Sequence, residues 1–89
     1  MKIDVYDSYA KTTDGRLMHF DVFVKEGTSA EVALRHGREW LKSLGESPAG
    51  LEQSRCSFCH TEVAKPEVQR SVEYEGFFIL QMEGCPTPV

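Results

Sequence analysis

Apolar and polar residues alternate along the first part of the chain, as they do in β-strands that bury one face. The alternation covers residues 2–10 and 16–25, and the turn-forming sequence Thr13-Asp14-Gly15 separates the two stretches. Asp-Gly between two such stretches is typical of a tight hairpin turn. The sequence therefore predicts an antiparallel β-hairpin at its N-terminus.

The length of the turn decides which side chains share a face of this hairpin. With a two-residue Asp14-Gly15 turn, the face expected to be buried carries three residues from each strand: Val5, Asp7 and Tyr9 with Val24, Val22 and Phe20. The other face is expected to carry Tyr6, Ser8, His19, Asp21 and Phe23. Such a face would suit a binding site or a dimer contact, although a partly solvated sheet face explains the same pattern.

Helical spacing of apolar residues follows from Ala30 to Leu44. The preceding Thr28-Ser29-Ala30-Glu31 has the spacing of a capping box, in which the Thr28 hydroxyl and the Glu31 carboxylate bind free amides of the first turn. Gly45 stands where a left-handed C-terminal cap is expected. Gly37 is unfavourable inside a helix, which suggests that the helix backbone approaches the sheet closely there.

The second half of the sequence predicts a strand over 51–58, a helix over about 65–75 and a strand over 77–82. Pro66 suits the first turn of this helix and Gly76 its end. The last strand is apolar on both alternating faces, which favours a central place in the sheet. The order β-β-α-β-α-β predicts a two-layer α+β fold with a mixed four-stranded sheet. Residues 1–89 are expected to form a single domain with an irregular tail over about 84–89.

The motif Cys56-Ser57-Phe58-Cys59-His60 is the clearest candidate for chemistry. A strand, helix, strand connection usually joins parallel strands through a right-handed crossover, and parallel strands end at the same edge of a sheet. Cys56 and Cys59 would then meet Cys85, which follows the last strand. His19 is held in reserve, because it reaches this edge only if its strand runs antiparallel to the third.

Three kinds of site fit these residues, and zinc is the preferred one. Zinc takes four nitrogen or sulfur ligands, which Cys56, Cys59, His60 and Cys85 would supply. Thiol redox chemistry is the alternative, although the helix begins several residues after the motif, unlike in thioredoxin-like sites. The motif also matches c-type haem attachment, with Met82 as a distal ligand, although the sequence shows no export signal. The cysteines can also be small buried residues without a ligand.

Charge and composition narrow the choice of partners. The 89 residues carry 14 acidic and 10 basic side chains, for a net charge of -4, and the basic residues are scattered among glutamates, which argues against nucleic acid. The N-terminus lacks the apolar run of a signal peptide or a membrane span, so a cytoplasmic location and no membrane partner are expected. No phosphate-binding loop or catalytic set is recognisable, which favours a binding module, monomeric or weakly homodimeric, over an enzyme.

Four stretches follow one another in a specific order: Asp4-Val5-Tyr6-Asp7, Met18-His19-Phe20-Asp21-Val22, the cysteine motif and Met82-Glu83-Gly84-Cys85. In this order they resemble a small bacterial family of domains of unknown function, numbered twenty twenty-four. The resemblance implies a bacterial origin, one compact α+β domain and no assigned activity. It supplies no catalytic residues, so the cysteine motif with Cys85 stays the candidate site.

Overall fold

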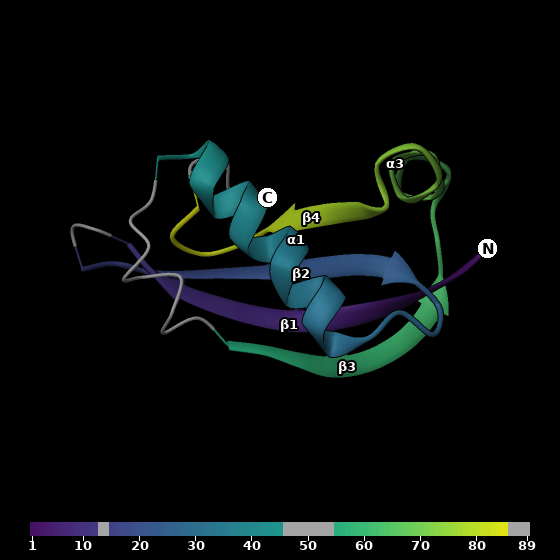
Figure 1. Ribbon diagram of the computed structural model, residues 1–89, viewed down its shortest axis with the longest axis horizontal. Helices are drawn as coiled ribbons and strands as arrows, with labels where there is room; N and C mark the ends of the chain where they lie inside the picture. The colour runs from purple at the N-terminus through teal and green to yellow at the C-terminus, as the bar shows by residue number, and fades with distance from the viewer. Residues whose placement is uncertain (13–14, 46–54, 86–89) are drawn as a thin grey trace.

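The computed structural model describes residues 1–12, 15–45 and 55–85, with residues 55–57 described by their backbone alone. The elements, shown in Figure 1, are β1 (Lys2–Lys11), β2 (Leu17–Lys25), α1 (Ala30–Ser43), β3 (Arg55–Val63), α3 (Pro66–Glu75) and β4 (Phe77–Gln81). This order confirms the predicted α+β sequence of elements. The part of the predicted third strand before residue 55 lies outside the described residues.

The sheet has the strand order β3-β1-β2-β4, and every neighbouring pair is antiparallel. The predicted mixed sheet is therefore wrong in its strand directions. The crossover rule applies to strands that lie parallel in one sheet. Here β3 pairs with the free edge of β1 and β4 with the free edge of β2, so α3 carries the chain from one edge of the sheet to the other. As a result, β3 and β4 run in opposite directions and the hairpin lies between them.

The register of the hairpin differs from the prediction by one residue. Thr12 pairs with Arg16, since the Thr12 amide donates to the Arg16 carbonyl at 2.7 Å and the Arg16 amide donates to Thr12 Oγ1 at 2.8 Å. Three residues therefore separate the pair, and Gly15 has the positive φ of 89° that such three-residue turns commonly use. A slip of one residue moves the side chains of one strand to the other face. Asp7 consequently lies opposite Asp21.

Helix α1 covers one face of the sheet and makes the larger core (Figure 1). The buried residues of this core are Tyr6, Ala10, Met18, Phe20, Val22, Val24, Ala33, Leu41 and Cys85. The predicted close approach at Gly37 is confirmed, because a Cβ added there would lie 3.3 Å from Cε2 of Phe20. Among the described residues, no helix is both long enough and apolar enough to cross a membrane.

The ends of α1 follow the sequence with one correction. Ser29 is the N-cap, and its hydroxyl accepts a hydrogen bond from the Val32 amide at 3.3 Å. The predicted capping box on Thr28 is wrong by one residue, because the Thr28 hydroxyl donates to the carbonyl of Lys25 at 2.6 Å. At the other end, Gly45 has a φ of 83°, which confirms the predicted left-handed cap.

Helix α3 packs on the opposite face of the sheet from α1. Val68 and Val72 of α3 form a second core with Ile3, Val5 and Phe23. The predicted two layers are therefore three at this end of the sheet, because the two helices lie on opposite faces. The rest of the second face, beyond α3, carries Asp7, Tyr9, His19 and Asp21 together with the exposed Leu17.

Strand β4 is an edge strand, and its predicted central position is wrong. Its alternating side chains are nevertheless apolar on both faces for a clear reason. Phe77 and Ile79 pack against the core under α1, whereas Phe78 and Leu80 pack against the core under α3. Two apolar faces thus reflect a helix on each side of the sheet and not a neighbouring strand on each side.

Gly84 tests how closely the segment after β4 packs on β2. Its φ is 78°, and a Cβ added there would collide with the carbonyl oxygen of Leu17. Gly45 is a matched control, because its φ is 83° and nothing lies within 4 Å of an added Cβ. We expect Gly84→Ala to lower the free energy of unfolding by about 3 kcal/mol and Gly45→Ala by about 1 kcal/mol, because only the first adds a clash to the left-handed backbone. Equal losses in urea denaturation would contradict this packing.

Candidate functional site

The structure separates the predicted cysteine ligands. Cys59 and His60 lie in β3 at one edge of the sheet, whereas Cys85 follows β4 at the other edge. Cys85 is buried, and its thiol donates a hydrogen bond to the backbone carbonyl of His19 at 3.3 Å. Burial raises the pKa of this thiol. The expectation that Cys85 joins the other cysteines is therefore wrong, because it depended on β3 and β4 being parallel. The side chain of Cys56 lies outside the described part of the structure.

The cysteine motif lies inside β3 and contains a β-bulge. Phe58 pairs with Tyr6 and His60 with Val5, so Cys59 is an extra residue without a partner on β1. The exposed Cys59 Sγ lies 3.2 Å from His60 Nδ1, and His60 Nε2 lies 3.1 Å from Glu62 Oε1. The bulge thus places thiol, imidazole and carboxylate in a row along the edge of the sheet. Metal binding by Cys56, Cys59 and His60 stays a prediction.

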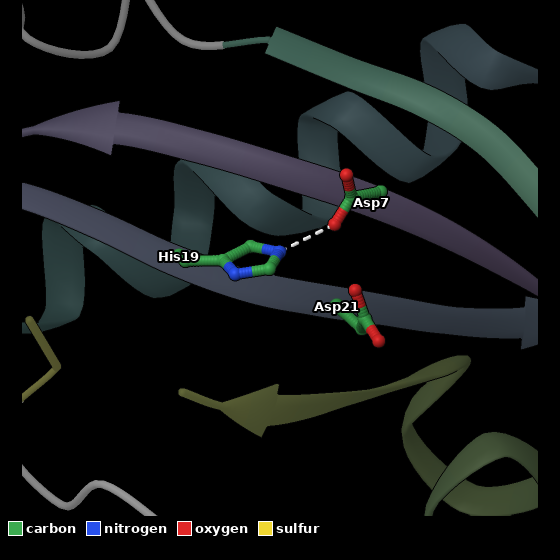
Figure 2. Close-up of side chains that lie close together, drawn as sticks. All are labelled: Asp7, His19 and Asp21. Carbon is green, nitrogen blue, oxygen red and sulfur yellow. Dashed lines mark hydrogen bonds and ion pairs between the residues drawn. The ribbon is translucent and has the colours of Figure 1, made fainter. Parts of the chain in front are cut away.

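A different cluster lies on the open part of the face that α3 covers only at one end. Figure 2 shows Asp7 of β1 beside His19 and Asp21 of β2, with α1 behind the sheet. One ligand atom from each residue can be chosen so that all three atoms lie within 4.8 Å of one another. His19 Nε2 and Asp7 Oδ1 are 2.5 Å apart. Among the described residues, this is the one group of three or more His, Cys, Asp or Glu side chains that meets this criterion.

The hairpin register assembles this cluster directly. Asp7 and Asp21 are cross-strand partners, and His19 stands two residues before Asp21 on the same face. Like charges directly opposite each other destabilise a sheet, so the His19 imidazole has a favourable place beside the two carboxylates. Tyr9, the cross-strand partner of His19, stacks on the imidazole with ring centroids 4.4 Å apart and an interplanar angle of 6°. Backbone pairing and ring stacking together fix the orientation of His19.

The electrostatics of the cluster favour a bound cation or proton. The pKa of Asp21 is raised to about 6. Burial is the main cause, and the negative charge of Asp7 is the second. His19 and His60 act in the opposite direction. The carboxylate of Asp7 also raises the pKa of the Tyr9 phenol. The cluster therefore gains negative charge close to neutral pH, where a cation can offset it.

Solvent reaches the cluster, whereas the nearby Asp4 is fully engaged in the fold. The side chains of His19 and Asp7 are 27% and 37% exposed. Asp4 is buried, and its two oxygens accept hydrogen bonds from the Gly27 amide at 3.0 Å and the Thr61 hydroxyl at 2.7 Å. Asp4 thus holds the loop after β2 and strand β3 together. Among the carboxylates in the described strands of the hairpin, Asp7 and Asp21 are open to a ligand.

The sequence over residues 1–82 matches the family described as Domain of unknown function (DUF2024). The chain belongs to this family. The matched range contains Asp7, His19 and Asp21 as well as Cys59 and His60, and it ends before Cys85. The resemblance inferred from the sequence is thus confirmed.

The fold of this DUF2024 protein is similar to a structure solved by NMR, that of protein NE1680 from Nitrosomonas europaea. The two chains are 44% identical, and the similarity covers 96% of this chain and 99% of that one, with a TM-score of 0.79. No curated protein matches the chain. The comparisons therefore establish the family and the α+β fold, and the geometry of the site carries the argument about function.

The raised pKa of Asp21 predicts how stability depends on pH. The ordinary pKa of its carboxyl is 3.8 and the folded pKa is about 6, so the folded state holds the proton more tightly. Stability from this proton is present below pH 3.8 and is lost as the pH rises through about 6. We expect Asp21→Asn to raise the free energy of unfolding by about 1 kcal/mol at about pH 7.5, after allowance for solvent screening, and by less at about pH 4.

Urea denaturation at the two pH values measures this difference. Glu73→Gln, on the exposed side of α3, is the control and should change stability equally at both. A stability gain for Asp21→Asn that is the same at both pH values would contradict the raised pKa.

Proposed function

We propose that this protein binds a divalent transition-metal ion through Asp7, His19 and Asp21. The observation that carries the proposal is the convergence of one imidazole nitrogen and two carboxylate oxygens within 4.8 Å of one another. Imidazole and carboxylate are ligands of zinc and of neighbouring divalent metals. The three side chains come from paired strands, which hold them more rigidly than loops would.

Charge supports the same proposal. Asp7 and Asp21 face each other across the hairpin, and a divalent ion would offset the repulsion between their carboxylates. The ion would take the place of the proton between His19 and Asp7. Three protein ligands leave further coordination positions for water or a small molecule, and the partial exposure of the site lets these molecules enter.

Zinc titration followed by calorimetry tests this function. We expect the wild-type protein to bind one zinc ion per chain, and Asp7→Asn and His19→Ala each to weaken binding by at least about tenfold, because each removes a ligand. Cys59→Ser and His60→Ala are the controls and should retain the wild-type affinity. Circular dichroism would check that each variant is folded.

The result that contradicts the proposal is also specific. If Cys59→Ser abolishes zinc binding while Asp7→Asn leaves it unchanged, the metal binds at the cysteine motif. If the folded wild-type protein binds no zinc, neither site holds this metal.

A second candidate function is thiol chemistry at Cys59. It is favoured by the row in which Cys59 Sγ contacts His60 Nδ1 and His60 Nε2 contacts Glu62 Oε1. In this arrangement His60 can take the thiol proton while Glu62 orients the imidazole. The thiolate would then attack a disulfide of a partner molecule, forming a mixed disulfide and releasing the partner's other sulfur as a thiolate.

Alkylation by iodoacetamide tests the second candidate. With Cys56 replaced by serine, we expect Cys59 to be alkylated at neutral pH about fivefold faster than in the same protein carrying His60→Ala, because the adjacent imidazole can accept the thiol proton as the sulfur attacks. Glu73→Gln on α3 is a control distant from the motif in sequence. Equal rates with and without His60 would show that Cys59 is an ordinary exposed thiol.

A further inference from the structure

A hollow of about 220 Å³ opens beside Asp21, between the second face of the sheet and the start of α3. Its apolar lining includes Ile3, Phe23, Val68, Phe78 and Leu80. Asp21 lines the same hollow, so this residue belongs both to the hollow and to the cluster with Asp7 and His19. An apolar cavity with few polar groups is the usual form of a small-molecule site.

The charged groups around the hollow are mostly acidic. Asp21, Glu62 and Glu67 contribute carboxylates, and Lys65 is the one basic side chain among the lining residues. Glu62 also contacts His60 at 3.1 Å. A cationic ligand therefore complements the lining better than an anionic one.

We infer that this hollow binds a small apolar amine. Its ammonium group lies against the carboxylate of Asp21, and its apolar part fills the space lined by Phe23, Phe78 and Val68. The two phenylalanine rings are near neighbours, with centroids 5.8 Å apart, and they offer an aromatic or aliphatic group a continuous apolar surface. The volume suits a single ring with a short side chain and is smaller than the pockets that hold drug-sized molecules.

Amine binding in the hollow is separate from metal binding and does not depend on it. The amine and the metal ion both use Asp21, so the two ligands compete whenever both bind. A metal ion on Asp7, His19 and Asp21 would remove the carboxylate that the ammonium group needs. Amine binding in the absence of metal therefore tests the hollow independently of the proposed metal site.

The test uses 2-phenylethylamine as the probe and phenylacetate as its anionic counterpart, each added to the metal-free full chain. Amide NMR spectra should show saturable shifts at Phe23, Val68 and Phe78 with the amine, and at least tenfold weaker binding of phenylacetate. Asp21→Asn should weaken amine binding by about tenfold, because it removes the charged partner of the ammonium group. Glu73→Gln, on α3 but outside the lining, should leave it unchanged.

Two further arms separate the possible outcomes. Leu80→Arg fills the hollow and adds positive charge, so a folded variant should lose amine binding. If the amine and phenylacetate bind equally, or if neither shifts these amides, the inference is overturned whether or not zinc binds. If the amine binds and zinc does not, the proposed metal function fails and this inference stands.

Discussion

Asp7 and Asp21 face each other across the first two strands, and this pairing sets the character of the part of the second face that α3 leaves open. Two carboxylates directly opposite each other oppose sheet formation, so the surrounding residues must hold them in place. The continuous ladder between β1 and β2 does so on one side, and the core under α1 does so on the other. His19 then lies beside both carboxylates, and the hairpin holds one imidazole and two carboxylates close together.

This arrangement makes the ionised form of Asp21 less stable. Burial and the charge of Asp7 raise its pKa to about 6, which means that its ionised form is unfavourable in the folded protein. Residues that reduce stability without serving the core are commonly found at functional sites. Asp4 shows the contrast, because both of its oxygens accept hydrogen bonds that tie parts of the fold together. Asp4 thus has a structural role in β1, whereas Asp7, three residues later in the same strand, is open to a ligand.

The sequence predicted most elements well because their signals are local, but it ended the third strand at residue 58, whereas β3 continues to Val63. Strand alternation, Pro66 at the start of α3, and Gly45 and Gly76 at the helix ends all act within a few residues. The placement of the candidate site depended on one non-local detail, the length of the turn after Thr12. A two-residue turn puts Asp7 on the opposite face from His19 and Asp21, whereas the observed three-residue turn puts all three together. The sequence analysis placed the three residues on two paired strands, but it did not predict the register between these strands.

The cysteine motif shows the opposite limitation. The spacing Cys56-x-x-Cys59-His60 is recognisable at sight, but bringing Cys85 to it required β3 and β4 to be parallel neighbours. In the structure β3 pairs with β1 and β4 pairs with β2, so the two strands lie at opposite edges of the hairpin. Which edge a strand joins depends on packing of the whole sheet and cannot be read from a motif within one strand.

Anomalous diffraction from crystals of the protein soaked in zinc is the most direct measurement of the central claim. The account predicts a peak about 2.0–2.2 Å from the ligand atoms of Asp7, His19 and Asp21. A peak at Cys59 and His60, with none on the open face of the hairpin, would contradict it.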